Sequence, residues 1–267
     1  VFLVSKIGIL FFGILRLLPN FQNIYYSWAQ INANSSQIDS FKNYKNKYSF
    51  QKKHGRVEID KIEIFLNNKK FMQIKKGESL CLIGPSGCGK TSFLDLISSL
   101  NKKRGFKVNY LDINSKIIDE NKAKNEISFI EQDVYLDDDT VKNIIFNCSI
   151  KNKIRDKNHL LKLADLGDLL NSEFWENKTI GTNGGNLSGG QKQKVAIAEA
   201  IAWKPSILIL DEATTGIDKE SEEKIWNELF KIKDIIIIAT THNKSLHDKF
   251  DNYINFLDED LQGFINK

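Results

Sequence analysis

The sequence has few prolines, cysteines and methionines. Among 267 residues there are three prolines, three cysteines and a single methionine. The cysteines, Cys81, Cys88 and Cys148, are widely spaced and match no zinc-ligand pattern. We therefore interpret them as small buried thiols of a protein that stays in a reducing compartment.

The sequence also lacks a marked excess of one charge. Lys and Arg number 38 and Asp and Glu number 34, which gives a net charge of +4. This balance excludes the strongly basic surface of a nucleic-acid-binding protein, so we expect no nucleic-acid partner. With 41% apolar and 27% charged residues, the composition is that of an ordinary globular protein. The length suits one large domain, or one domain with an appendage.

Downstream of residue 57, apolar segments alternate between strand-like and helix-like patterns. Three apolar runs, at 79–83, 207–210 and 235–238, are typical of the buried central strands of a parallel sheet, and only Ser79 at the start of the first run is polar. Between the first two runs, the leucines of 160–170 recur at helical spacing. Strands that alternate with helices predict an α/β fold with a mostly parallel sheet.

A glycine-rich segment, residues 84–91 (the glycine loop), follows the first of these runs. Its sequence GPSGCGKT satisfies the pattern G-x-x-x-x-G-K-[ST], and a helical pattern comes after it. Glycines let backbone N–H groups approach phosphate oxygens, and a helix N-terminus adds partial positive charge. Lys90 can neutralise the β- and γ-phosphates, and the Thr91 hydroxyl can bind magnesium. The nucleotide-binding residues predicted here are Gly84, Pro85, Ser86, Gly87, Cys88, Gly89, Lys90, Thr91 and Ser92.

Two carboxylates follow the apolar run 207–210. We expect Asp211, at the tip of a central strand, to hold magnesium, and Glu212 to polarise an attacking water. Many strands end in acidic residues, so the pair alone is a weak signal. Its place downstream of a glycine loop is the order found in P-loop enzymes, which strengthens the prediction.

The segment Leu187-Ser-Gly-Gly-Gln191, the signature segment, indicates a family. Ser188 can cap a helix, and Gly189 and Gly190 can expose its terminal N–H groups to a phosphate. The chain here resembles the ATP-binding cassettes of ABC ATPases. The resemblance implies a P-loop core with a small antiparallel β-subdomain and an inserted helical subdomain. It also implies that residues 188–191, Gln191 included, face a nucleotide on a second cassette in a head-to-tail dimer, which we expect to be a homodimer.

Three further residues match the same family. Gln132 resembles the glutamine that reaches magnesium and the attacking water, and His242 resembles the switch histidine beside the γ-phosphate. Asp218 fits the loop that follows the catalytic carboxylates. The resemblance therefore implies Glu212, His242, Gln132 and Lys90 as catalytic residues, Thr91, Gln132 and Asp211 as magnesium ligands, and ATP and Mg²⁺ as cofactors.

The chain departs from the family pattern in three places. Leu66 aligns with the aromatic residue that stacks on adenine, and Phe65 would point to the other face of a strand. Glu199 stands where many relatives have arginine, which we interpret as a changed surface charge. The segment 57–76 is short, which suggests a trimmed β-subdomain.

The first 18 residues are strongly apolar, but Lys6 and Arg16 interrupt them. A span needs about 20 apolar residues, and a charge in mid-bilayer costs about 2.5–3.5 kcal/mol. We therefore interpret residues 1–31 as the end of a last transmembrane helix and its cytoplasmic extension, in a chain that continues upstream. Residues 32–56 would be a basic linker and residues 57–267 the ABC nucleotide-binding domain. A signal peptide and a buried amphipathic helix are the alternatives for this stretch.

Together these features predict a membrane-bound ATP hydrolase whose cassette lies on the cytoplasmic side and powers export or flipping. Residues 16–24 resemble the last membrane helix of half-transporters related to lipid-linked oligosaccharide flippases, which suggests a lipid-linked or surface glycan as cargo. A soluble ABC-type clamp in DNA repair or translation is the alternative, although it usually has two cassettes or a long coiled coil. A catalytically inactive binding module is disfavoured by the intact set of site residues.

Overall fold

The computed structural model divides the chain into two compact units, Val1–His54 and Gly55–Lys267. The residues it describes are 11, 13, 15–28, 30, 57–99, 105–146 and 156–256. The predicted linker 32–56 lies outside these residues, as does Cys148.

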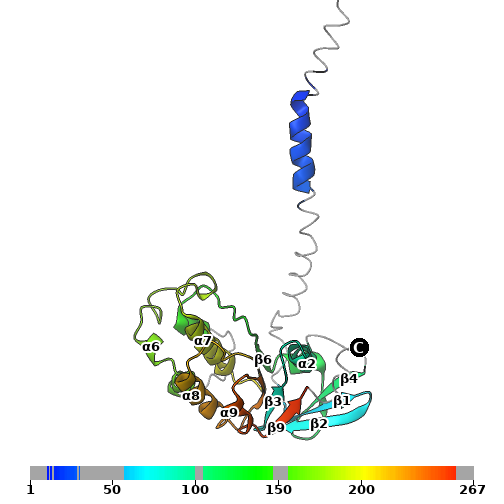
Figure 1. Cartoon of the computed structure of the whole chain (residues 1–267), viewed down its shortest axis with the longest axis vertical. Helices are drawn as coiled ribbons and strands as arrows, with labels where there is room; N and C mark the ends of the chain where they lie inside the picture. Colours follow the sequence, from blue (N-terminus) through cyan, green and yellow to red (C-terminus); the bar gives the residue numbers. More distant parts are fainter. Residues whose placement is uncertain are drawn as a thin grey trace, which may run out of the picture. The chain divides into compact units, whose positions relative to one another are not determined.

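The described residues of the first unit, between positions 11 and 30, are helical (Figure 1). Their large apolar side chains are exposed, among them Leu18, Phe21, Ile24 and Trp28. Among the described residues, no helix combines the length and the apolar character that a membrane span requires. Residues 1–10, which belong to the predicted membrane segment, lie outside that search.

The second unit contains a four-stranded antiparallel sheet with the strand order β2-β1-β4-β5. Asn67 and Asn68 connect the first two strands and have φ values of 48° and 65°. Asparagine tolerates this left-handed conformation, which two-residue hairpin turns require. The strands are β1 (Lys61–Leu66), β2 (Lys69–Lys75), β4 (Phe106–Leu111) and β5 (Ile117–Ile118).

The other sheet has five strands in the order β6-β7-β8-β3-β9, and every neighbouring pair is parallel. This observation confirms the predicted α/β fold with a parallel sheet and a separate antiparallel sheet. The strands are β3 (Ser79–Ile83), β6 (Ile127–Ile130), β7 (Ile207–Asp211), β8 (Ile236–Thr240) and β9 (Asn252–Asn255).

Apolar side chains cover both faces of the parallel sheet, which explains why its strands are continuously apolar. In β7, Leu208 and Leu210 pack into one buried cluster with the helices α4, α5, α7 and α8. The alternate residues, Ile207 and Ile209, pack into a second cluster with α2 and the antiparallel sheet. The helices are α2 (Lys90–Ile97), α3 (Glu120–Lys124), α4 (Val141–Phe146), α5 (Lys157–Leu163), α6 (Gly167–Leu170), the 3₁₀ turn η1 (Thr182–Gly184), α7 (Gly189–Ala202), α8 (Lys219–Leu229) and α9 (Lys244–His247).

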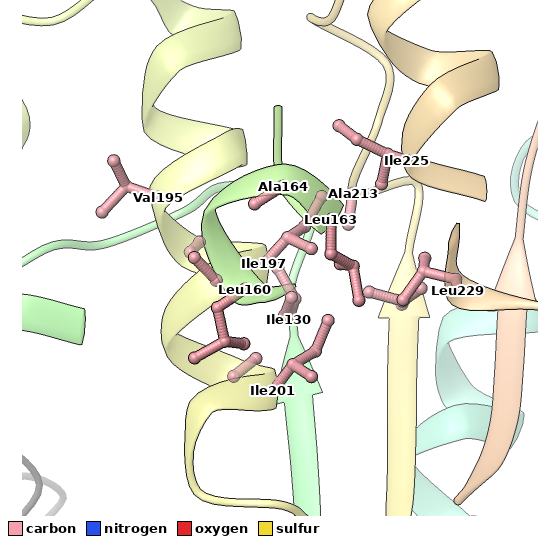
Figure 2. Packing of buried hydrophobic residues seen from close by; sticks show 14 of the residues in the cluster. Ile130, Leu160, Leu163, Ala164, Val195, Ile197, Ile201, Ala213, Ile225 and Leu229 are labelled. Carbon is pink, nitrogen blue, oxygen red and sulfur yellow. The ribbon is translucent and has the colours of Figure 1, made fainter. Parts of the chain in front are cut away.

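The leucines of 160–170 belong to two short helices rather than to one continuous helix. Asp165 separates α5 from α6 and has a φ of 49°, a left-handed conformation that ends a helix. Leu160 and Leu163 of α5 are fully buried where this helix packs against α7 and α8 (Figure 2). This helical layer fixes the position of α7, whose first turn contains most of the signature segment.

Candidate functional site

The candidate site lies where four parallel strands end. The glycine loop follows β3, Asp211 ends β7, Thr240 ends β8, and Gln132 comes two residues after β6. Because these strands belong to one parallel sheet, their carboxyl ends meet at one edge. The sheet therefore gathers residues that are far apart in the sequence.

The glycine loop needs its first and last glycines for different reasons. A Cβ on Gly84 would lie 2.7 Å from the sulfur of Cys88 and 3.0 Å from the Cβ of Phe256, so a side chain there would clash. Gly89 has a φ of 100° at the N-cap of α2, a conformation that favours glycine. The loop thus turns sharply enough for a helix to begin at Lys90, with its free N–H groups at the loop.

Lys90 lies across this loop. Its Nζ donates hydrogen bonds to the carbonyl oxygens of Gly84 and Pro85, both at 2.9 Å, and only 8% of the residue is exposed. A lysine that is this buried holds its charge close to the loop amides. The ammonium group and the amides together form a positively polarised surface that suits a phosphate chain.

The Asp211 carboxylate accepts hydrogen bonds from two hydroxyl groups. Thr91 Oγ1 donates to its Oδ2 at 2.6 Å, and Thr240 Oγ1 donates to its Oδ1 at 2.6 Å. Asp211 is buried, and the Thr240 contact fixes the orientation of its carboxylate. The first contact joins the glycine loop to β7 and brings together two oxygen ligands of the type that Mg²⁺ prefers.

Glu212 and His242 meet beside Asp211. Nε2 of His242 lies 2.8 Å from Oε1 of Glu212, and the side chains are 58% and 14% exposed, respectively. The Glu212 N–H donates to Thr240 Oγ1 at 2.8 Å, so Thr240 supports both carboxylate residues. Glu212 has a φ of 50°, which is unfavourable for a residue with a side chain. Such strained residues cluster at functional sites.

The signature segment begins α7 with a reciprocal cap. Ser188 Oγ accepts a hydrogen bond from the Gln191 N–H at 3.2 Å, and Gln191 Oε1 accepts one from the Ser188 N–H at 2.9 Å. A Cβ on Gly190 would lie 2.7 Å from the carbonyl oxygen of Gly216. A Cβ on Gly189 would meet no atom within 4 Å among the described residues. The segment therefore packs closely against the loop at Gly216, whereas Gly189 is open to its surroundings.

A buried polar cluster connects α7 with α8. Lys194 Nζ donates to Asp165 Oδ2 at 2.9 Å and to Ser221 Oγ at 2.8 Å, and Ser221 Oγ donates to the same carboxylate oxygen at 2.7 Å. The hydrogen bond from Ser221, and then the hydrogen bond and positive charge of Lys194, lower the pKa of Asp165. Asp218 caps α8 by accepting from the Ser221 N–H at 3.0 Å. The cluster thus ties the predicted Asp218 loop to the helix that begins at the signature segment.

The structure brings together some of the predicted residues and leaves others apart. Direct hydrogen bonds or ion pairs join Thr91 to Asp211 and His242 to Glu212. Gln132 is exposed after β6, and within the described part of the chain no hydrogen bond joins it to Asp211. Leu66 is half-buried against the apolar cluster of the antiparallel sheet. Ser92 is exposed in the first turn of α2.

Sequence reasoning missed several polar residues that support this site. Thr240, Thr214, Glu222 and Asn243 contact the predicted residues or their neighbours in the chain. A signal was available for Thr240, because a hydroxyl residue that ends a continuously apolar strand lies at the edge where Asp211 lies. The sequence offers no such signal for Glu222, which stands among other acidic residues, and only the fold shows that it is buried.

The fold and the edge at which these residues meet define a P-loop nucleotide-binding protein. Comparison with known families then places the chain. The model of the ABC transporter family matches residues 66–215, which is more than half of the chain. The chain belongs to this family, as the signature segment predicted, and membership implies an ATP-binding cassette of the ATP-hydrolysing type.

Individual proteins agree with this assignment. The chain is 31% identical over 206 residues to the lactococcin-G-processing and transport ATP-binding protein LagD of Lactococcus lactis, a match that covers 74% of the chain and 29% of LagD. It is 30% identical over 264 residues to the ATP-dependent lipid A-core flippase of Vibrio parahaemolyticus, covering 91% and 44%. A bacterial Atm1-family ABC exporter solved with ATP bound has the same fold, with a TM-score of 0.63 at 21% identity, covering 74% of the chain and 37% of the exporter. The chain therefore spans less than half the length of these relatives.

Proposed function

We propose that the chain is the motor part of a membrane exporter and that it hydrolyses ATP at the edge of its parallel sheet. The observation that carries this proposal is the contact of 2.8 Å between Glu212 and His242, directly beside Asp211. A carboxylate and an imidazole in contact can share the tasks of orienting a water and sensing a phosphate. Their place next to the glycine loop makes the γ-phosphate of ATP the group on which they act.

The glycine loop would bind the triphosphate. Backbone N–H groups of the glycine loop and of the first turn of α2 would point at phosphate oxygens; Pro85 has none to offer. Lys90 would turn its ammonium from the loop carbonyls to the β- and γ-phosphates. The short contact between Thr91 and Asp211 fits Mg²⁺, because it offers two oxygen ligands at one place. Gln132 would complete the ligands from the end of β6. When bound, the ion supplies neutralisation of phosphate charge.

Glu212 would act as the general base. Its carboxylate orients the attacking water and accepts a proton as the water oxygen bonds to the γ-phosphorus. The bond from the γ-phosphorus to the β–γ bridging oxygen breaks, and ADP leaves. His242 holds that carboxylate through Nε2 and, being exposed, is free to contact the phosphate. Lys90 and the loop amides stabilise the charge that develops on the phosphate oxygens.

A second cassette would complete the site. Gly189 and Gly190 present helix N–H groups at the start of α7, because those of Ser188 and Gln191 are used in the cap. Gly189 leaves the approach open. A head-to-tail homodimer would place this segment on the ATP of the partner. Closing and reopening of two such cassettes would convert hydrolysis into movement of attached membrane helices.

The rest of the transporter would lie upstream in the same chain. We propose that residues 1–31 are the end of its last membrane helix, 32–56 a linker, and 57–267 the cassette on the cytoplasmic side. The exposed apolar side chains between positions 11 and 30 support contact with a membrane. The relative from Vibrio parahaemolyticus is named a lipid A-core flippase, which supports a lipid-linked glycan as the cargo.

The substitution Glu212→Gln tests the proposal. Loss of the general base is expected to lower phosphate release by about 10²–10⁴-fold, while binding of a fluorescent ATP analogue stays intact because the glycine loop is unchanged. Glu220→Gln is the matched control, since Glu220 pairs with Lys224 on the exposed side of α8. Unchanged phosphate release by the Glu212→Gln protein would refute the assignment.

A further inference from the structure

We propose that Glu222 is a positioning residue for ATP hydrolysis, which holds the two chain segments that carry Glu212 and His242 in register. The inference rests on the proposed function and adds a residue that contacts neither the glycine loop nor the side chains of Glu212 and His242. Glu222 lies in the first part of α8 and only 8% of it is exposed. A buried carboxylate requires hydrogen-bond partners, and these partners define its role.

Each oxygen of the Glu222 carboxylate binds a different segment. Oε1 accepts a hydrogen bond from Thr214 Oγ1 at 2.7 Å, and Oε2 accepts one from Asn243 Nδ2 at 2.9 Å. Thr214 comes two residues after Glu212, and Asn243 comes directly after His242. One carboxylate therefore bridges the segment after β7 and the segment after β8.

The partners leave little freedom in this arrangement, which we call the Glu222 bridge. Trp226 Nε1 donates to Thr214 Oγ1 at 3.4 Å, so the threonine hydroxyl is directed to Glu222 as a donor. Asn243 Oδ1 caps α9 by accepting from the Ser245 N–H at 3.1 Å and from Ser245 Oγ at 2.7 Å. The amide nitrogen of Asn243 must then face the carboxylate.

The bridge matters for hydrolysis because the contact of His242 with Glu212 depends on where the two chain segments lie. More than half of the His242 side chain is exposed, so its position depends on the backbone on which it stands. The backbone of Glu212 is strained, and a strained conformation also needs support from its surroundings. A shift of about 1 Å in such a pair can lower a rate about 10²-fold.

The decisive variant is Asn243→Asp, because it keeps an oxygen to cap α9 and changes only the donor to an acceptor. It sets two carboxylates against each other across the bridge. We expect kcat for ATP to fall about 10–100-fold, with little change in KM. The melting temperature should fall as well, because two carboxylates then meet at a buried site. Glu222→Gln alone should stay within about threefold of the wild type, because a carboxamide can accept from Asn243 and donate to Thr214.

The double variant Glu222→Gln with Asn243→Asp provides the rescue. Its carboxamide can donate to the new aspartate and accept from Thr214, so the bridge is restored with the opposite polarity. We expect kcat to return to within about threefold of the wild type, a non-additivity that marks direct coupling. Glu223→Gln, at the exposed neighbouring position, is the matched control and should leave kcat unchanged.

The outcomes separate this inference from the proposed function. If Glu212→Gln stays fully active, the proposed function fails, whatever the bridge variants do. If Glu212→Gln is inactive, the bridge is tested by Asn243→Asp alone and by the double variant. An unchanged kcat in Asn243→Asp would overturn the role of Glu222. So would a loss of activity that appears in KM rather than in kcat, or a double variant in which kcat does not recover.

Discussion

Gly189 and Gly190 are neighbours in the sequence and face different surroundings. In the described structure, a Cβ on Gly190 would meet the backbone of Gly216, whereas one on Gly189 would meet nothing within 4 Å. We predict that Gly190→Ala lowers the free energy of unfolding by about 1–3 kcal/mol through overpacking. Gly189→Ala should be neutral or slightly stabilising, because alanine favours a helix by about 1 kcal/mol over glycine. Urea denaturation of the two variants measures the difference, and equal stabilities would contradict it.

Individual residues of the candidate site differ in how far the sequence alone can predict them. The glycine loop, Asp211 and the signature segment are local patterns, so each could be predicted without knowing the fold. The contacts of Thr91 with Asp211 and of Glu222 with Asn243 join residues that only the sheet order brings together. Even the strained φ of Glu212 has no local signature, since glutamate is not a residue that favours this conformation.

At the scale of elements, α7 contains a residue that sequence analysis misjudged. Glu199 was expected to change a surface charge, but it is only partly exposed in the structure. Burial of the carboxyl group, and then the negative charge of Asp137, raise its pKa to about 7. Ser188 predicted the start of this helix, but no local pattern shows that the loop containing Asp137 lies beside Glu199.

This raised pKa gives the stability of the chain a pH dependence. The ordinary glutamate pKa is 4.5, so between that pH and about 7 the folded state keeps a proton that the unfolded state loses. The contribution of Glu199 to stability is thus lost as the pH rises, by up to about 3 kcal/mol. We predict that Glu199→Gln stabilises the chain at pH 8 but hardly at pH 4.5, as measured by urea denaturation. An equal effect of the substitution at both pH values would contradict this assignment.

Element boundaries were less predictable than element types. The leucines of 160–170 have helical spacing throughout, and the break at Asp165 depends on its contacts with Lys194 and Ser221 in other helices. The break therefore arises from partners that are distant in the sequence. Where β1 pairs with β2, the register shifts between Ile64 and Phe65, whereas the pairing of β1 with β4 stays regular.

At the scale of the whole molecule, the division of the chain predicts that the second unit folds alone. The buried residues of both described clusters belong to Gly55–Lys267. A protein of residues 57–267 should therefore keep the melting temperature of the whole chain within about 3 °C, by scanning calorimetry, and the same affinity for ATP. The buried Ile225→Ala serves as a positive control, since loss of about 2–5 kcal/mol should lower the melting temperature by several degrees. A fall of that size in the truncated protein would contradict the prediction.

The order of strands in the parallel sheet has a consequence for synthesis on the ribosome. β3 carries the glycine loop, and it pairs with β8 through Ser79 and Ile237 and with β9 through Leu80 and Asn252. Since a chain emerges from its N-terminus, β3 leaves the ribosome long before either of these neighbours exists. The nucleotide can therefore stabilise the chain only after β8 and β9 have emerged, and ATP cannot assist the earlier stages of folding.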